Sequence, residues 1–79
     1  MAEKLQLEMV TPYRKVLSEQ VEEVTAPGTL GEFGLLPGHT PLLTTLDIGE
    51  LTYIQDGKSF RVAVNWGYVE VENNTVTVL

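Results

Sequence analysis

Residues 28–46 read GTLGEFGLLPGHTPLLTTL, and this stretch limits how the rest of the chain can fold. It holds four of the seven glycines, two of the four prolines and the only histidine. Between Phe33 and Leu46 there is no Asp, Glu, Lys or Arg. Pro37 and Pro41 each remove a backbone donor, so this apolar run cannot be a regular helix. The stretch therefore predicts short extended segments joined by fixed turns.

The centre of this stretch predicts a rigid turn. Leu36-Pro37-Gly38-His39 fits a type II turn, with proline at the second position and glycine at the third. Leu36 and Thr40 each precede a proline, which pushes both residues to extended conformations. Such a restrained loop loses little entropy on binding. From the pattern alone, a loop that closes one end of the fold and a loop that displays a binding surface are equally good interpretations.

The remainder of the chain alternates apolar and polar residues with period two, which predicts strands. Strands are expected at residues 5–9, 15–18, 21–26, 50–55, 59–64, 68–72 and 75–79. Turns are expected at Pro27-Gly28, at Asp56-Gly57 and at Asn73-Asn74, and a bulge or tight bend at Asn65-Trp66-Gly67. Glu19-Gln20 is expected to separate the second strand from the third. No segment shows a helical period. With eight to ten short strands, the fold class is all-β, a sandwich or flattened barrel.

Side-chain positions follow from the same alternation. Leu51 and Tyr53 are expected on one face of their strand, and Val69 and Val71 are expected to pack on the closing strand of a hairpin. Trp66 is expected in the core, with Tyr68 partly covering it. The alternative for these two aromatic residues is a ligand-stacking surface, as in a sugar-binding module.

Length and charge narrow the function classes. Seventy-nine residues make one domain at most, and no cysteine is present, which fits a reducing compartment. The net charge of −6 disfavours nucleic acid and anionic membrane surfaces as partners. No run of residues is long and apolar enough to span a bilayer. We therefore expect a soluble protein whose partner is neutral or basic where it makes contact.

Motifs for chemistry are weak in this sequence. Gly57-Lys58-Ser59 resembles the end of a phosphate-binding loop, but Thr52 stands where that motif needs glycine. His39 is the only histidine, which excludes a His-rich metal site. A catalytic role for His39 would need Glu32 or Asp47 to orient it and an activated hydroxyl beside it. We expect neither a catalytic residue nor a metal or cofactor site.

Residues 31–44, GEFGLLPGHTPLLT, followed by Ile48-Gly49, strongly resemble the signature of the epsilon subunit of F-type ATP synthases. The mitochondrial counterpart in that family is called delta. The resemblance extends to LQLEMVTP at 5–12 and to GYVEV at 67–71, and covers essentially the whole chain. It implies a ten-stranded β-sandwich over residues 1–79. It also implies that a two-helix C-terminal domain of the family is absent, so inhibition of hydrolysis and ATP binding are not assigned to these residues.

The resemblance further implies a non-catalytic rotor subunit in the central stalk, which binds gamma and the c-ring and couples proton flow to ATP synthesis. It places the protein at the cytoplasmic face of a bacterial plasma membrane, or the equivalent organelle side, as a peripheral subunit. Carried over by position, Glu32 in a Gly-Glu-Phe-Gly turn faces the c-ring. Phe33 and Leu42 would supply apolar contact there. The residues near both gamma and the c-ring are Gly38, His39, Thr40 and Thr11. The leucines of residues 31–46 are expected to face inward.

Overall fold

The computed structural model describes residues 3–79, and these form nine strands. The strands are β1 (Leu5–Val10), β2 (Lys15–Val21), β3 (Glu23–Gly28), β4 (Gly31–Leu35), β5 (Leu42–Leu46), β6 (Gly49–Gln55), β7 (Lys58–Val64), β8 (Gly67–Glu72) and β9 (Thr75–Val78). The all-β prediction is confirmed, with nine strands in this range where the resemblance implies ten. No helix occurs between residues 3 and 79, and so none that is long and apolar enough to cross a membrane.

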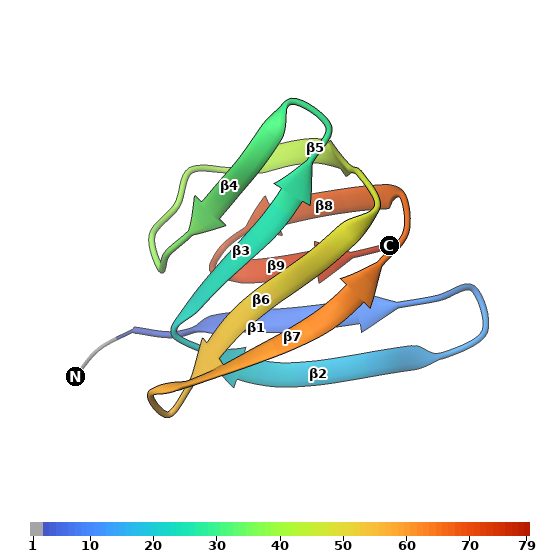
Figure 1. Ribbon diagram of the computed structural model, residues 1–79. Helices are drawn as coiled ribbons and strands as arrows, with labels where there is room; N and C mark the ends of the chain where they lie inside the picture. The colour runs from blue at the N-terminus through green and yellow to red at the C-terminus, as the bar shows by residue number, and fades with distance from the viewer. Residues whose placement is uncertain (1–2) are drawn as a thin grey trace.

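The strands form one continuous sheet that curls into two layers. Its order is β2-β1-β9-β8-β5-β3-β6-β7, and β4 pairs with β3 outside this path. In Figure 1, β3, β4, β6 and β7 run diagonally in front of the layer that contains β1, β2, β8 and β9. The layers join where β3 meets β5, through the single pair Gly28–Leu46. The predicted flattened sandwich is confirmed.

Fourteen hydrophobic residues fill the space between the layers. Their period-two spacing in β1, β8 and β9 points one face of each strand inward, which each strand needs to bury its apolar side chains. Burying one such Leu or Val contributes roughly 1.5–3 kcal/mol. The buried residues are Leu5, Leu7, Val21, Val24, Ala26, Leu35, Leu46, Leu51, Tyr53, Val64, Val69, Val71, Val76 and Val78. Leu51 and Tyr53 are both buried, which confirms the prediction that they share one face of their strand.

Two hairpins close through the turns that the sequence predicts. Asp56 and Gly57 have φ angles of 52° and 76°, and Asn73 and Asn74 have φ angles of 51° and 58°. Positive φ at both central residues defines a type I′ turn, whose twist matches that of the flanking strands. In the second hairpin β8 and β9 pair Val69 with Val78 and Val71 with Val76, as predicted.

One predicted break between strands and one predicted turn are wrong. Glu19 and Gln20 do not interrupt a strand, because β2 continues through them while paired with β1, and the chain bends one residue after Val21. Pairing across the hairpin outweighs their low strand propensity. Pro27-Gly28 is not a turn either, since both residues end β3 and the chain reverses at Thr29-Leu30.

The predicted burial of Trp66 is also wrong. The Trp66 side chain is 69% exposed and that of Tyr68 is 55% exposed. The predicted bend is present, because Trp66 has a φ of 34°. At the next position a Cβ atom would overlap the Leu79 carbonyl, so only glycine fits there. The backbone turns at this close approach, and the indole points outward instead of into the core.

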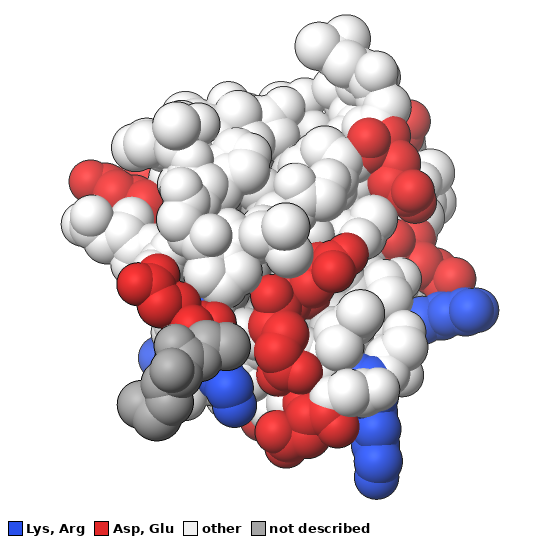
Figure 2. Space-filling model, turned by 90° about the vertical axis from the view of Figure 1, so that its left-hand side faces the viewer, with Lys and Arg blue, Asp and Glu red and all other residues white. Residues whose placement is uncertain are grey.

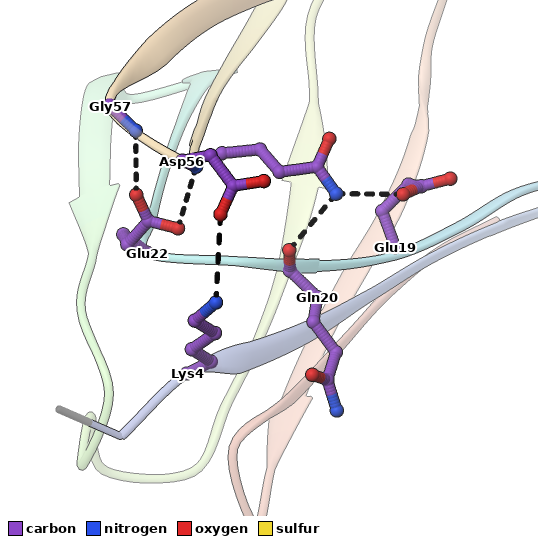
Figure 3. A network of polar contacts seen from close by, with 7 residues as sticks. Lys4, Glu19, Gln20, Glu22, Asp56 and Gly57 are labelled. Carbon is purple, nitrogen blue, oxygen red and sulfur yellow. Dashed lines mark hydrogen bonds and ion pairs between the residues drawn. The ribbon is translucent and has the colours of Figure 1, made fainter. Parts of the chain in front are cut away.

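A polar network fastens the β6–β7 hairpin to the corner between β2 and β3 (Figure 3). The Glu22 carboxylate accepts hydrogen bonds from the backbone amides of Asp56 and Gly57, each at 3.1 Å. The Gln55 side chain donates to the Gln20 carbonyl of β2 at 3.2 Å. These contacts hold the end of one layer against the other.

Candidate functional site

The three residues expected to face the c-ring lie together. Glu32 and Phe33 on β4 and Leu42 on β5 line one hollow of about 290 Å³. The rest of its lining comes from Gly28, Leu30, Gly31 and Thr44. Glu32 is exposed, whereas Phe33 and Leu42 are half-buried. The lining of the hollow is therefore mainly apolar, and Glu32 is its one charged residue.

The position of Glu32 differs from the expected turn. Residues 31–35 form strand β4, in which Glu32 is paired with Pro27 of β3. The Gly-Glu-Phe-Gly segment is thus extended, and the reversal precedes it. Because alternate residues of a strand point to opposite faces, Glu32 projects outward while Phe33 turns toward the core.

Phe33 is held in place by a glycine on the neighbouring strand. The ring lies so close to Gly28 that a Cβ atom there would be 2.9 Å from two of its carbons. The same Cβ would be 2.8 Å from the Gly31 carbonyl oxygen. Phe33 also packs against the core cluster. The aromatic part of the lining is therefore a rigid part of the sheet.

The expectation that the leucines face inward is only half right. Leu35 and Leu46 are buried, but the Leu36 and Leu43 side chains are 58% and 68% exposed. Leu30, at the tip between β3 and β4, is fully exposed. Neighbouring leucines in an extended segment cannot share a face, so one of each pair must point outward. These outward leucines add apolar surface around the hollow and the loop that follows it.

Gly38, His39 and Thr40 lie in the loop of residues 36–41, which we call the β4–β5 loop. The predicted type II turn is confirmed, with a φ of 87° at Gly38 and a 3.1 Å hydrogen bond from the His39 amide to the Leu36 carbonyl. All three residues are exposed. The His39 ring nitrogen Nδ1 lies 2.7 Å from the Thr40 carbonyl, a contact that requires Nδ1 to carry the proton.

Thr11 is not brought to this loop. It follows the end of β1, whereas the β4–β5 loop is anchored beside Gln6 near the start of β1, about 17 Å away along an extended strand. The Thr11 hydroxyl accepts hydrogen bonds from the Tyr13 and Arg14 amides at 3.3 and 3.2 Å. The hydroxyl therefore closes the β1–β2 turn.

The arrangement offers no support for catalysis by His39. Within residues 3–79 its ring forms no hydrogen bond to Glu32 or Asp47, and the Asp47 carboxylate instead accepts from the Ile48 amide at 2.8 Å. No cluster of three His, Cys, Asp or Glu residues suited to a metal ion occurs in the same part of the chain. What this site exposes is an apolar hollow and a loop of fixed conformation.

Sequence reasoning missed a second hollow, at the other end of the sandwich. It has a volume of about 330 Å³ and is lined mainly by apolar side chains, among them Val16, Trp66 and Leu79. Thr11 belongs to this lining. The signal available in the sequence was the glycine next to Trp66. A glycine beside a large aromatic residue marks a tight bend, and a side chain at such a bend can point outward.

Charge is unevenly distributed over the surface. Figure 2 shows the side of the molecule on which the β4–β5 loop lies, with a broad uncharged area in its upper part and a band of acidic residues below. The β4–β5 loop lies within the run from Phe33 to Leu46, which contains no charged residue. The uncharged part of this side can therefore form apolar and backbone contacts without desolvating many charges.

Known proteins resemble this chain over its whole length. The model of the family described as ATP synthase, Delta/Epsilon chain, beta-sandwich domain, matches residues 4–79. The chain is 70% identical over 79 residues to the ATP synthase epsilon chain of Citrifermentans bemidjiense, and 66% identical to that of Geotalea daltonii. Each alignment spans the whole of this chain but only 57% of the relative.

Solved structures share the fold. A chain of the Euglena gracilis mitochondrial ATP synthase, OSCP/F1/c-ring, superposes with a TM-score of 0.90 at 23% identity, which covers 99% of this chain and 51% of that one. A chain of the Tetrahymena thermophila mitochondrial ATP synthase, central stalk/c-ring, superposes with a TM-score of 0.77 at 20% identity, covering 98% and 63%. The predicted resemblance is confirmed, and the chain belongs to the delta/epsilon family of ATP synthase subunits, of which it forms the β-sandwich domain.

Proposed function

We propose that this chain is the sandwich part of a non-catalytic rotor subunit of a proton-translocating F-type ATP synthase. The observation that carries the proposal is its 70% identity, over all 79 residues, to an ATP synthase epsilon chain. In this role it binds the gamma subunit and the c-ring in the central stalk and helps couple proton flow to ATP synthesis. It is peripheral to the membrane, on the cytoplasmic face or its organelle equivalent, and is attached there through the complex.

The hollow lined by Glu32, Phe33 and Leu42 is the proposed c-ring contact. An exposed ion pair between Glu32 and a basic loop would contribute only about 0–1 kcal/mol. Charge at a rim acts mainly on orientation and association rate, so the apolar lining and the exposed leucines supply affinity. In this proposal Glu32 orients the partner, and Phe33 and Leu42 supply the affinity.

The β4–β5 loop and the Thr11 turn are the proposed contacts shared between gamma and the c-ring. Gly38, His39 and Thr40 are exposed and conformationally restrained, so they present a fixed shape. Thr11 uses its hydroxyl within its own turn and contributes the shape of that turn. Because Thr11 lies far from the loop, a partner that touches both extends along the length of β1.

The experiment is binding of the chain to a purified gamma–c-ring assembly at low salt. Glu32→Lys is expected to weaken binding and to leave the thermal unfolding temperature unchanged, because its side chain is exposed and forms no hydrogen bond within residues 3–79. Glu50→Lys makes the same charge change at an exposed position on β6 and serves as the control, although it also removes the exposed 4.0 Å ion pair with Arg61, which contributes about 0–1 kcal/mol. Failure of the unmodified chain to bind would overturn the assignment, and loss of the fold in Glu32→Lys would make Glu32 structural.

A second candidate function is a free-standing ligand-binding module. Trp66 and Tyr68 are both exposed and line one hollow of about 490 Å³, an arrangement that suits stacking on a planar or sugar ligand. Trp66 is the only tryptophan, so its fluorescence reports this surface directly. An emission shift on adding a small ligand, with none on adding gamma, would favour this function over the rotor subunit.

A further inference from the structure

One side chain, that of Asn74, connects three segments that lie far apart in the chain. Its Oδ1 atom accepts a 2.7 Å hydrogen bond from the Gly38 amide of the β4–β5 loop. Its Nδ2 atom donates to the Glu3 carboxylate at 3.2 Å. The Asn74 backbone carbonyl accepts from the Gln6 amide at 2.8 Å. The turn between β8 and β9 is thereby joined to the loop and to the start of β1.

The orientation of the Asn74 amide follows from its two partners. The Gly38 amide can only donate, so it must meet the oxygen of the side chain. The ionised Glu3 carboxylate can only accept, so it must meet the nitrogen. Both requirements select the same rotamer, and reversing the amide would lose both bonds. The connection is therefore specific to a side chain that has an acceptor and a donor at this spacing.

This hydrogen bond is a main restraint on the β4–β5 loop. Pro37 and Pro41 have no amide hydrogen to offer. The bond from His39 to Leu36 closes the turn from within but does not attach it to the sheet. Among the hydrogen bonds formed within residues 3–79, that from Gly38 to Asn74 is the one that attaches this loop to another strand pair. The loop's position on the body of the domain thus depends on a residue 36 positions later in the sequence.

A role in the turn alone does not account for this arrangement. Asn73 and Asn74 both adopt positive φ, a conformation that asparagine and glycine tolerate well, so the turn explains asparagine at either position. Only one of the two side chains reaches across to the loop. Asn73, which is exposed, forms no side-chain hydrogen bond with any residue that the structure describes. The turn therefore contains a natural internal control.

We propose that Asn74 is a positioning residue, which holds the segment Gly38–Thr40 in its binding conformation before any partner arrives. The effect on binding rests on the proposed rotor function, because this segment is part of the proposed contact with gamma and the c-ring. The structural part of the inference is independent of that function. A loop fixed in advance loses less conformational entropy on association, so the effect of Asn74 appears as tighter binding although it lies outside the proposed contact.

The test compares Asn74→Gly with Asn73→Gly in the 79-residue chain. Glycine accepts positive φ at both positions, so each variant keeps the turn and only the first loses the bridge. Exchange of the Gly38 amide with water, measured by NMR, should become roughly two- to tenfold faster in Asn74→Gly, which is the effect of losing one net hydrogen bond. It should stay unchanged in Asn73→Gly. Equal Gly38 exchange rates in both variants would overturn the proposal.

Asn74→Asp separates the acceptor from the donor. The carboxylate still accepts from the Gly38 amide but can no longer donate to Glu3, so slow exchange at Gly38 should persist at neutral pH. A carboxylate at position 74 also repels that of Glu3, so Asn74→Asp is compared with Asn74→Asp combined with Glu3→Gln. Fast exchange that persists in the double variant would contradict the proposed role of Oδ1, whereas fast exchange that Glu3→Gln reverses would come from the repulsion and would support it.

Binding to the gamma–c-ring assembly completes the test. Asn74→Gly should weaken binding severalfold while Asn73→Gly binds as the unmodified chain does. Faster Gly38 exchange with unchanged affinity would refute positioning for binding. If the unmodified chain does not bind at all, the rotor function fails, whereas the exchange data still decide whether Asn74 holds the loop.

Discussion

The Glu22 carboxylate accepts a 3.1 Å hydrogen bond from the amide of Gly57, a residue 35 positions later in the chain. This bond is the largest cause that lowers the pKa of the Glu22 carboxyl from its ordinary value of 4.5, and a second bond from the Asp56 amide adds to it. Both bonds favour the ionised form. Folding of the two layers against each other is therefore linked to the charge on Glu22.

Glu22→Gln should make the fold less sensitive to acid. In the unfolded chain Glu22 takes up its proton near pH 4.5, and in the folded chain it does so at lower pH. Its stabilising effect is thus complete above pH 4.5 and is lost as pH falls through the lowered folded value. We expect Glu22→Gln to lower the unfolding temperature at pH 7 and to flatten its decline below pH 4.5, as followed by circular dichroism.

Glu23→Gln is the control for this experiment. It removes the same charge from the adjacent residue, whose side chain forms no hydrogen bond with the residues from 3 to 79. It should leave the decline at acidic pH largely in place. Identical acid profiles for Glu22→Gln and the unmodified chain would show that the two amide bonds do not contribute.

Gly28→Ala should push the Phe33 ring out of its place. The new Cβ would lie 2.9 Å from the ring and 2.8 Å from the Gly31 carbonyl oxygen, so the ring or the strand must shift. Overpacking of this kind costs about 1–3 kcal/mol, which denaturant unfolding measures. In the Phe33→Leu background the same substitution should cost less, because the smaller side chain can move away. An equal cost in both backgrounds would assign the strain to the backbone alone.

Gly67→Ala should destabilise the fold more severely. The added methyl group would overlap the carbonyl of Leu79. The Leu79 backbone pairs with that of Tyr68 through both its amide and its carbonyl oxygen. We expect a loss of about 2–3 kcal/mol, or roughly 10–20 °C in unfolding temperature. Gly34→Ala is the matched control, because a Cβ atom at Gly34 meets nothing within 4 Å. The control should change stability by less than about 1 kcal/mol, and a similar loss in both variants would contradict the steric explanation.

Local backbone chemistry explains which features could be predicted from the sequence. The turns at Asp56-Gly57 and Asn73-Asn74 require positive φ, and the residues that accept this conformation are adjacent in the sequence. The turn at Pro37-Gly38 is equally local. Alternation with period two then identifies strands, and with them an all-β fold. The residues that carry the family resemblance are also contiguous, so membership in the family could be recognised from the sequence alone.

Which large side chains in bends point outward, and which distant segments meet, was decided by the tertiary structure. Trp66 is a large aromatic residue of the kind expected in a core, but it points outward. The backbone bends there, because Gly67 packs closely against the Leu79 carbonyl. Glu32 lies in a strand because residues 31–35 pair with β3, and the residues next to Glu32 in the sequence do not indicate this pairing. Gly38 and Asn74 meet only because β5 pairs with β8 in the sheet. Period-two alternation is the same for every strand order, so the order itself, and the surface it assembles, depends on packing between residues far apart in the chain.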